Sequence, residues 1–242
     1  MKFLVLILTS LSLLVSSSNG FVVSSTSISF YQGYGDEFYT VNGTVGDNHE
    51  IVNLQIPSVY NNLPVYSIGE MSLAYIPNLT SVVIDNGVRN IGYEAFFDDQ
   101  SLIDVFIPDS VTNIGGNVFG QCFALESVRL SQSLESIAPG LFWECRSLQE
   151  ITIPDSVTSI GDLAFHGCSS LNSIIFEGNA PTLGDNAFGS STSVIYHYEN
   201  ATGFDSSDWD GLNLVAIPVP EPSSYALLLG SLALGLVGVL RR

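Results

Sequence analysis

The sequence predicts an α/β-type repeat solenoid with a parallel sheet, short second strands and short helical turns, plus an apolar C-terminal helix. Apolar side chains recur at every twenty-third position through the middle of the chain. Each repeat opens with residues that are alternately apolar and polar, and a separate apolar run stands near each end. One such unit is too short to bury its own apolar side, so neighbouring units must stack and share a core.

The repeat is defined by five apolar columns that stay in phase. The first column opens each unit with leucine, and the last holds phenylalanine in every unit. The columns are Leu79, Leu102, Leu125, Leu148, Leu171; Ile84, Ile107, Leu130, Ile153, Phe176; Val88, Val111, Leu134, Val157, Ala180; Ile91, Ile114, Ile137, Ile160, Leu183; and Phe96, Phe119, Phe142, Phe165, Phe188. An earlier, longer unit fits the same scheme with Ile51, Leu54, Ile56, Val65, Ile68 and Leu73.

Each unit is expected to contain three elements. The stretch from Leu102 to Ile107 alternates with period two, which is typical of a strand with one buried face, and Pro108 ends it. Residues 111–115 form a second short extended segment, which stops at Gly115. The stretch leading to Phe119 is predicted to be a helical turn that lays its ring into the core.

The ends of the chain carry targeting signals. Lys2, the apolar run Phe3–Val15 and the small residues Ser18-Asn19-Gly20 are typical of a secretory signal peptide. A buried first strand of a cytosolic protein is the alternative. At the other end, Pro220-Glu221-Pro222 precedes an apolar run from Tyr225 to Leu240. As a helix this run would reach about 24 Å, and the terminal Arg241 and Arg242 can snorkel to help span a bilayer. Their charge places that end in the cytoplasm.

The three-part tail resembles the PEP-CTERM sorting signal of Gram-negative bacteria. The resemblance implies an exosortase as a partner during sorting, at least transient anchoring in the membrane, and delivery to the cell surface or extracellular matrix. An ordinary single-pass anchor is one alternative. A GPI signal is another, since Asn-x-Thr sequons occur at Asn42, Asn78 and Asn200, although such tails normally end without arginines.

The repeats also resemble a known family. Ile-Pro-Asp-Ser-Val-Thr-x-Ile-Gly occurs at 107–115 and 153–161, followed each time by Phe-x-x-Cys. This pattern resembles the BspA-type leucine-rich repeat of bacterial surface proteins over about residues 36–217. The resemblance implies a binding or adhesive surface rather than catalysis.

These patterns divide the chain into five parts. We expect a signal peptide (1–20), an N-terminal cap (21–50), six leucine-rich repeats (51–193), a C-terminal cap (194–217) and the sorting tail with its transmembrane helix (218–242). Caps are needed because an open end of a solenoid exposes apolar surface and an unpaired sheet edge.

The charge balance excludes one class of partner. Acidic residues outnumber basic ones 24 to 6, and the formal net charge is −18. Such a surface repels phosphate backbones, so nucleic-acid binding is not expected.

No cofactor, metal or catalytic centre is expected. Cys122, Cys145 and Cys168 occupy one column and are predicted to be small buried residues, with a single stacked disulfide or a metal site as alternatives. The histidines, His49, His166 and His197, fall in different parts of the repeat scheme. Residues 205–211 resemble a loose calcium-loop fragment, for which a solvated acidic turn is the preferred interpretation. A hydrolase triad assembled from scattered residues is a weaker alternative.

The outward positions of the predicted sheet are the candidate partner-binding site. If Leu102, Val105 and Ile107 point inward, Asp104 and Phe106 point outward. The apolar outward residues Val83 and Phe106 are flanked by Arg129 and hint at a contact surface. The predicted site comprises Val83, Asp104, Phe106, Arg129, Glu150, Thr152 and Ile175.

The sequence therefore predicts an exported interaction protein that binds a protein or polysaccharide through its sheet face. The alternative is a purely structural matrix or envelope component without a specific ligand.

Overall fold

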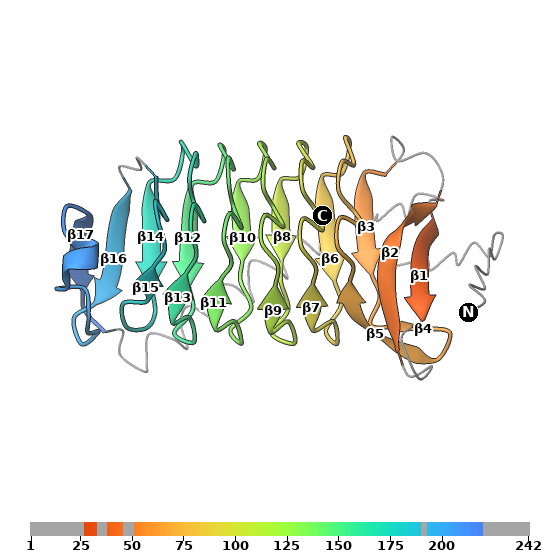
Figure 1. Ribbon diagram of the computed structural model, residues 1–242, viewed down its shortest axis with the longest axis horizontal. Helices are drawn as coiled ribbons and strands as arrows, with labels where there is room; N and C mark the ends of the chain where they lie inside the picture. Colours follow the sequence, from red (N-terminus) through yellow and green to blue (C-terminus); the bar gives the residue numbers. More distant parts are fainter. Residues whose placement is uncertain (1–26, 33–37, 46–50, 190–192, 220–242) are drawn as a thin grey trace, which may run out of the picture.

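The protein is a parallel β-solenoid in the computed structural model, which describes residues 27–32, 38–45, 51–189 and 193–219. Each 23-residue coil contributes one strand to a first sheet, a shorter strand to a second sheet, and a run of turns that we call the turn side. Figure 1 shows the strands of both sheets standing in rows along the long axis.

The first sheet holds the alternating segments that open the coils. Its strands are β3 (Asn53–Ile56), β6 (Ser81–Ile84), β8 (Asp104–Phe106), β10 (Ser127–Arg129), β12 (Glu150–Ile153), β14 (Ser173–Phe176), β16 (Val194–Tyr198) and β17 (Asn213–Ile217). Pairs are parallel and in register, with no shift from one coil to the next.

The second sheet holds the short segments that come before the turn side, each followed by a corner residue that is glycine in all coils but one. Its strands are β5 (Leu63–Ile68), β7 (Asn90–Ile91), β9 (Asn113–Ile114), β11 (Ser136–Ile137), β13 (Ser159–Ile160) and β15 (Thr182–Leu183). At the N-terminal end β1 (Ser27–Gln32) pairs antiparallel with β2 (Tyr39–Val45), and β2 joins β5. The short β4 (Val59–Tyr60) folds back on β5.

The repeated apolar columns form one continuous core. The opening leucines, the second apolar column (Ile84, Ile107, Leu130, Ile153 and Phe176) and the phenylalanines are all buried. Neighbouring phenylalanine rings from Phe96 to Phe188 lie 5.5–5.8 Å apart and are inclined by 7–16° to one another. The predicted stacking of coils around the phenylalanine column is confirmed.

The predicted helical turns are wrong. The segments leading to the phenylalanines are turns, and the one helix among the described residues is a short 3₁₀ helix (Ser207–Trp209) near the C-terminal end. Two residues of each turn side adopt left-handed backbone, as Glu94 (φ 53°) and Asp98 (φ 60°) do, and no α-helix can run through them. Their N–H groups instead donate to the next coil, from Glu94 to Gly116 O (3.0 Å) and from Asp98 to Gly120 O (2.8 Å).

The solenoid makes about seven turns, because β16 continues the first sheet. Val194 pairs with Ser173 in the same parallel register as the inner coils. The end of the core behind it is covered by Phe204 and Trp209, which are buried against Phe176.

Both sheets are interrupted beside the coil 125–147. The second sheet stops between β9 and β11, and the first stops one coil later, between β10 and β12. In the other coils the corner residue is glycine, and a Cβ added at Gly115 would lie 2.5 Å from Tyr93 N of the preceding coil. Here the residue is Ala138, so its coil cannot approach as closely. Gly115 N donates to Ile91 O (2.8 Å), but the described bonds include none from Ala138 to Ile114.

The three cysteines of the repeat column are buried, and none of them forms a disulfide. Each thiol donates to a phenylalanine carbonyl of the preceding coil, Cys122 to Phe96 O (3.2 Å), Cys145 to Phe119 O (3.0 Å) and Cys168 to Phe142 O (3.1 Å). Burial raises the pKa of all three thiols. The prediction of small buried residues is confirmed.

One coil earlier, the cysteine column holds a buried carboxyl group. Asp99 accepts a hydrogen bond from Ile76 N (2.7 Å) through Oδ1, while its buried Oδ2 has no hydrogen-bond partner. Burial raises the pKa of Asp99 to about 9.

The targeting segments lie outside the described residues. This holds for residues 1–20, for Pro220-Glu221-Pro222, for the predicted C-terminal helix and for Arg241 and Arg242. Within the part that is described, no helix is long and apolar enough to cross a membrane.

Candidate partner-binding surface

The outward columns predicted on the first sheet lie side by side. Strand pairing sets Val83 beside Phe106 and Phe106 beside Arg129. The same register sets Ser81 beside Asp104 and Asp104 beside Ser127. The sheet therefore brings together Val83, Asp104, Phe106 and Arg129, as the sequence predicted.

Val83 and Phe106 form an apolar patch in contact with water. Phe106 is 47% exposed and Val83 is 38% exposed, although each lies on a strand that is paired on both sides. The guanidinium carbon of Arg129 lies 4.6 Å from the centroid of the Phe106 ring. One face of the ring is thus occupied by a cation of the same chain.

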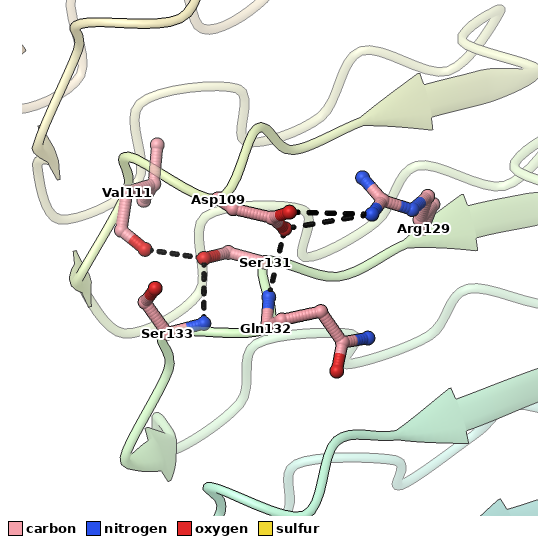
Figure 2. A network of polar contacts seen from close by, with 6 residues as sticks. All are labelled: Asp109, Val111, Arg129, Ser131, Gln132 and Ser133. Atoms are coloured by element: carbon pink, nitrogen blue, oxygen red, sulfur yellow. Dashed lines mark hydrogen bonds and ion pairs between the residues drawn. The ribbon is translucent and has the colours of Figure 1, made fainter.

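Arg129 is held between the ring and a carboxylate. Its Nη2 lies 3.5 Å from Asp109 Oδ2, and Asp109 Oδ1 accepts a hydrogen bond from Gln132 N (3.0 Å) (Figure 2). The neighbouring Ser131 is fully buried; its hydroxyl donates to Val111 O (2.6 Å) and accepts from Ser133 N (3.1 Å). This network fixes the loop that orients Arg129.

Asp109 was not predicted as part of the site. It lies in the loop after β8, one coil before Arg129, and an alternation argument covers strand residues only. Its signal in the sequence is the column that it shares with Gln132 and Asp155, which repeats polar residues at the corner of each coil.

A second carboxyl group, that of Glu177, lies near the loops that follow the first-sheet strands and carry Asp109 and Gln132. The pKa of Glu177 is raised by its partial burial, an effect that a hydrogen bond with Gln132 opposes. The nearby charge of Asp155 raises the pKa further, and that of Arg129 lowers it. Arg129 is thus a single positive charge beside the carboxyl groups of Asp109, Asp155 and Glu177.

The remaining predicted residues lie beyond the interruption of the sheet. Glu150 and Thr152 are exposed on β12, and Ile175 beside Thr152 on β14 is only partly exposed. Because β10 and β12 are not paired, these three form a group separate from the patch around Phe106.

Other candidate chemistry is dispersed. Across the described residues no group of three or more His, Cys, Asp or Glu side chains is placed to hold a metal ion, and Asp205, Asp208 and Asp210 are no exception. His197 stacks on Phe204 at 4.3 Å, His166 lies on the turn side, and His49 is outside the described residues.

Comparison with known families gives two matches. The BspA type Leucine rich repeat region matches residues 66–195 in six copies, more than half of the chain. The PEP-CTERM protein-sorting motif matches residues 218–242. The motif implies export, processing by an exosortase and attachment at the surface. No curated protein matches the chain.

Solved structures share the fold. A leucine-rich repeat protein of T. pallidum (TpLRR) is 23% identical, with a TM-score of 0.60 over 65% of this chain and 83% of that one. A leucine rich cell surface protein of Faecalibacterium prausnitzii is 30% identical, with a TM-score of 0.51 over 69% of this chain. The match spans 52% of the length of the F. prausnitzii protein.

Proposed function

Because this chain belongs to the BspA-type leucine-rich repeat proteins and ends in a PEP-CTERM sorting motif, we propose that it is a non-enzymatic interaction protein of the cell surface or extracellular matrix of a Gram-negative bacterium. It binds a protein or polysaccharide partner through the outer face of the first sheet. The similar cell surface protein of F. prausnitzii supports the location.

The observation that carries the proposal is the patch of Val83, Phe106 and Arg129. Apolar side chains exposed on the interior strands of a sheet cannot contribute to the core, and an apolar cluster with a fixed charge beside it is typical of a contact surface. Arginine and aromatic residues are also the types most enriched where interfaces carry their binding energy.

Binding to surface and matrix material of the producing cells tests the proposal. The mature protein with both Val83→Ser and Phe106→Ser should bind at least about tenfold more weakly than the parent, which corresponds to about 1.4 kcal/mol. Val59→Ser is the matched control, because Val59 is 57% exposed but lies on β4, which pairs with β5 and not with a strand of the first sheet. Equal binding by all three proteins would mean that the contact lies elsewhere on the surface, and no binding by any of them would favour a purely structural component.

The chain division is part of the proposal. We propose that residues 1–20 are removed on export, that 21–50 and 194–217 close the ends of the repeats 51–193, and that the tail 218–242 anchors the protein until exosortase cleaves it. Mass spectrometry of the mature C-terminus tests this. A terminus within or close to Pro220-Glu221-Pro222 is expected, and replacement of Arg241 and Arg242 by alanine should leave the tail uncut. An intact Arg242 in the parent protein would instead indicate a permanent anchor.

A further inference from the structure

The turn side of the coils carries a group of aromatic side chains. This group is separate from the patch of Val83, Phe106 and Arg129 on the first sheet. We define the aromatic strip as Tyr75, Tyr93, Phe97 and Trp143. Tyr75 is 52% exposed and Tyr93 is 45% exposed, while Phe97 and Trp143 are partly exposed. These residues come from three coils, and the rings of Tyr75, Phe97 and Trp143 meet across them.

A glycine permits the rings to meet. Phe97 and Trp143 are two coils apart, and Gly120 occupies the equivalent position in the coil between them. A Cβ on Gly120 would lie 3.0 Å from ring carbons of Phe97. The ring centroids of Phe97 and Trp143 are 6.5 Å apart with nearly parallel planes (13°), and Tyr75 meets Phe97 edge-on at 5.8 Å.

Carboxylates accompany the rings along the turn side. Glu94 follows Tyr93 in the chain, Asp98 follows Phe97, and Glu144 follows Trp143. Glu144 pairs with Arg146 (2.9 Å), whereas no ion pair of the described residues involves Glu94 or Asp98. Asn117 Nδ2 donates both to Tyr93 Oη (3.1 Å) and to Glu94 Oε1 (3.4 Å), and so fixes the Tyr93 ring beside the carboxylate.

The chain's own arginines indicate what such a surface binds. The described residues contain three arginines and no lysine, and each arginine lies over an aromatic ring. Arg89 lies 4.3 Å from the Tyr66 ring centroid, and Arg129 and Arg146 lie 4.6 Å from those of Phe106 and Phe123. Among the described contacts, no cation lies over a ring of the aromatic strip.

We propose that the aromatic strip is a second binding surface, which takes an arginine-bearing segment of a basic partner protein. A guanidinium ion is planar, stacks on aromatic faces and pairs with carboxylates, so it matches both components of the strip. The unpaired charges of Glu94 and Asp98 and the net charge of −18 favour a cation and repel anionic polymers. This surface is independent of the sheet face and lies on a different side of each coil.

The test compares two peptides of equal charge on the full-length mature protein. One peptide carries arginine at alternate positions, and the other carries lysine at the same positions. At physiological salt we expect the arginine peptide to bind about tenfold more tightly, because lysine lacks the stacking plane. Binding should also change the fluorescence of Trp143, since the other tryptophan, Trp209, is only 2% exposed at the far end of the core.

Variants that leave the charge unchanged locate the site. Tyr75→Ser with Trp143→Ser should reduce the preference for arginine to within about twofold, while Tyr31→Ser, which removes an exposed tyrosine (55%) on β1, should leave it intact. The melting temperature of each variant is compared with that of the parent, and Tyr75→Ser alone serves if the double variant is destabilised. Equal affinity for the two peptides, or an unchanged tryptophan signal, would overturn the proposal. So would tighter binding of a neutral linear glucan that the same variants abolish.

Discussion

Two neighbouring coils, 102–124 and 125–147, differ in how they attach to the rest of the solenoid. The first has Gly115 at its corner and pairs with the coil before it on both sheets. The second has Ala138 there, and it pairs with the coil before it only on the first sheet and with the coil after it only on the second. The phenylalanine stack nevertheless continues, with Phe119 and Phe142 5.8 Å apart.

The turn side also continues across both interruptions. Phe119 N donates to Leu141 O (3.0 Å) and Phe142 N to Ala164 O (2.9 Å). The comparison teaches that close backbone approach decides where the second sheet is continuous, whereas packing of the interior and the turn-side bonds hold successive coils together. Four experiments examine this division, beginning with the largest expected effect.

Phe142→Ala should be the most damaging. It removes a fully buried ring from the stack within the coil that already lacks part of its sheet pairing. Large-to-small substitutions of this kind cost about 3–5 kcal/mol. The free energy of unfolding from urea titration measures the effect, with Val59→Ala as an exposed control. A loss below about 1 kcal/mol would mean that the stack is not what holds this coil.

Asp99→Cys replaces the buried carboxyl group of the cysteine column by the thiol that the following coils carry, and tests how that carboxyl group affects stability. The folded-state pKa of Asp99 is raised to about 9 from its ordinary 3.8, so the folded protein prefers the protonated acid. Its contribution to stability is fully present below about pH 3.8 and is lost as the pH rises through about 9. From pH 5 to pH 7 the parent should therefore lose about 2–3 kcal/mol relative to Asp99→Cys. Parallel stability curves for the two proteins would contradict this.

Gly115→Ala should interrupt the second sheet between β7 and β9, where it is continuous in the parent protein. The new Cβ would meet Tyr93 N at 2.5 Å, so the coil must move away from its neighbour at a cost of about 1–3 kcal/mol. Hydrogen exchange at the amide of residue 115 should accelerate, because its bond to Ile91 O is lost. Ala138→Gly is the reverse change, and faster rather than slower exchange there would argue against the steric explanation.

Phe106→Ser should have the smallest effect on stability. The side chain is 47% exposed and faces away from the core, so we expect a change within about 0.5 kcal/mol. Thermal unfolding measures it, and a fall of several degrees in Tm would mean that the sheet patch is structural.

The interior could be predicted from the sequence because its columns repeat one residue type at one spacing. The turn side could not, because left-handed backbone at Glu94 and Leu163 has no signature in those residue types, although Asn117 and Gly140 at the same position do suggest it.

The sheet patch was predicted because alternation decides which way Phe106 points. Asp109 was missed because it reaches Arg129 from a loop. The interruption of the second sheet was missed because the difference between alanine and glycine matters only when the neighbouring backbone is in place.

The constant register of the coils has an evolutionary consequence. Because the strand pairs of the 23-residue coils link equivalent positions, a gene could lose or gain whole units without redesign of the rest. Excision of residues 125–147 would join Ala124 to Leu148, bring Phe119 against Phe165 and set Gly161 behind Gly115. Such a deletion would shorten the rod by about 4.8 Å and would leave a glycine before every turn side along the second sheet.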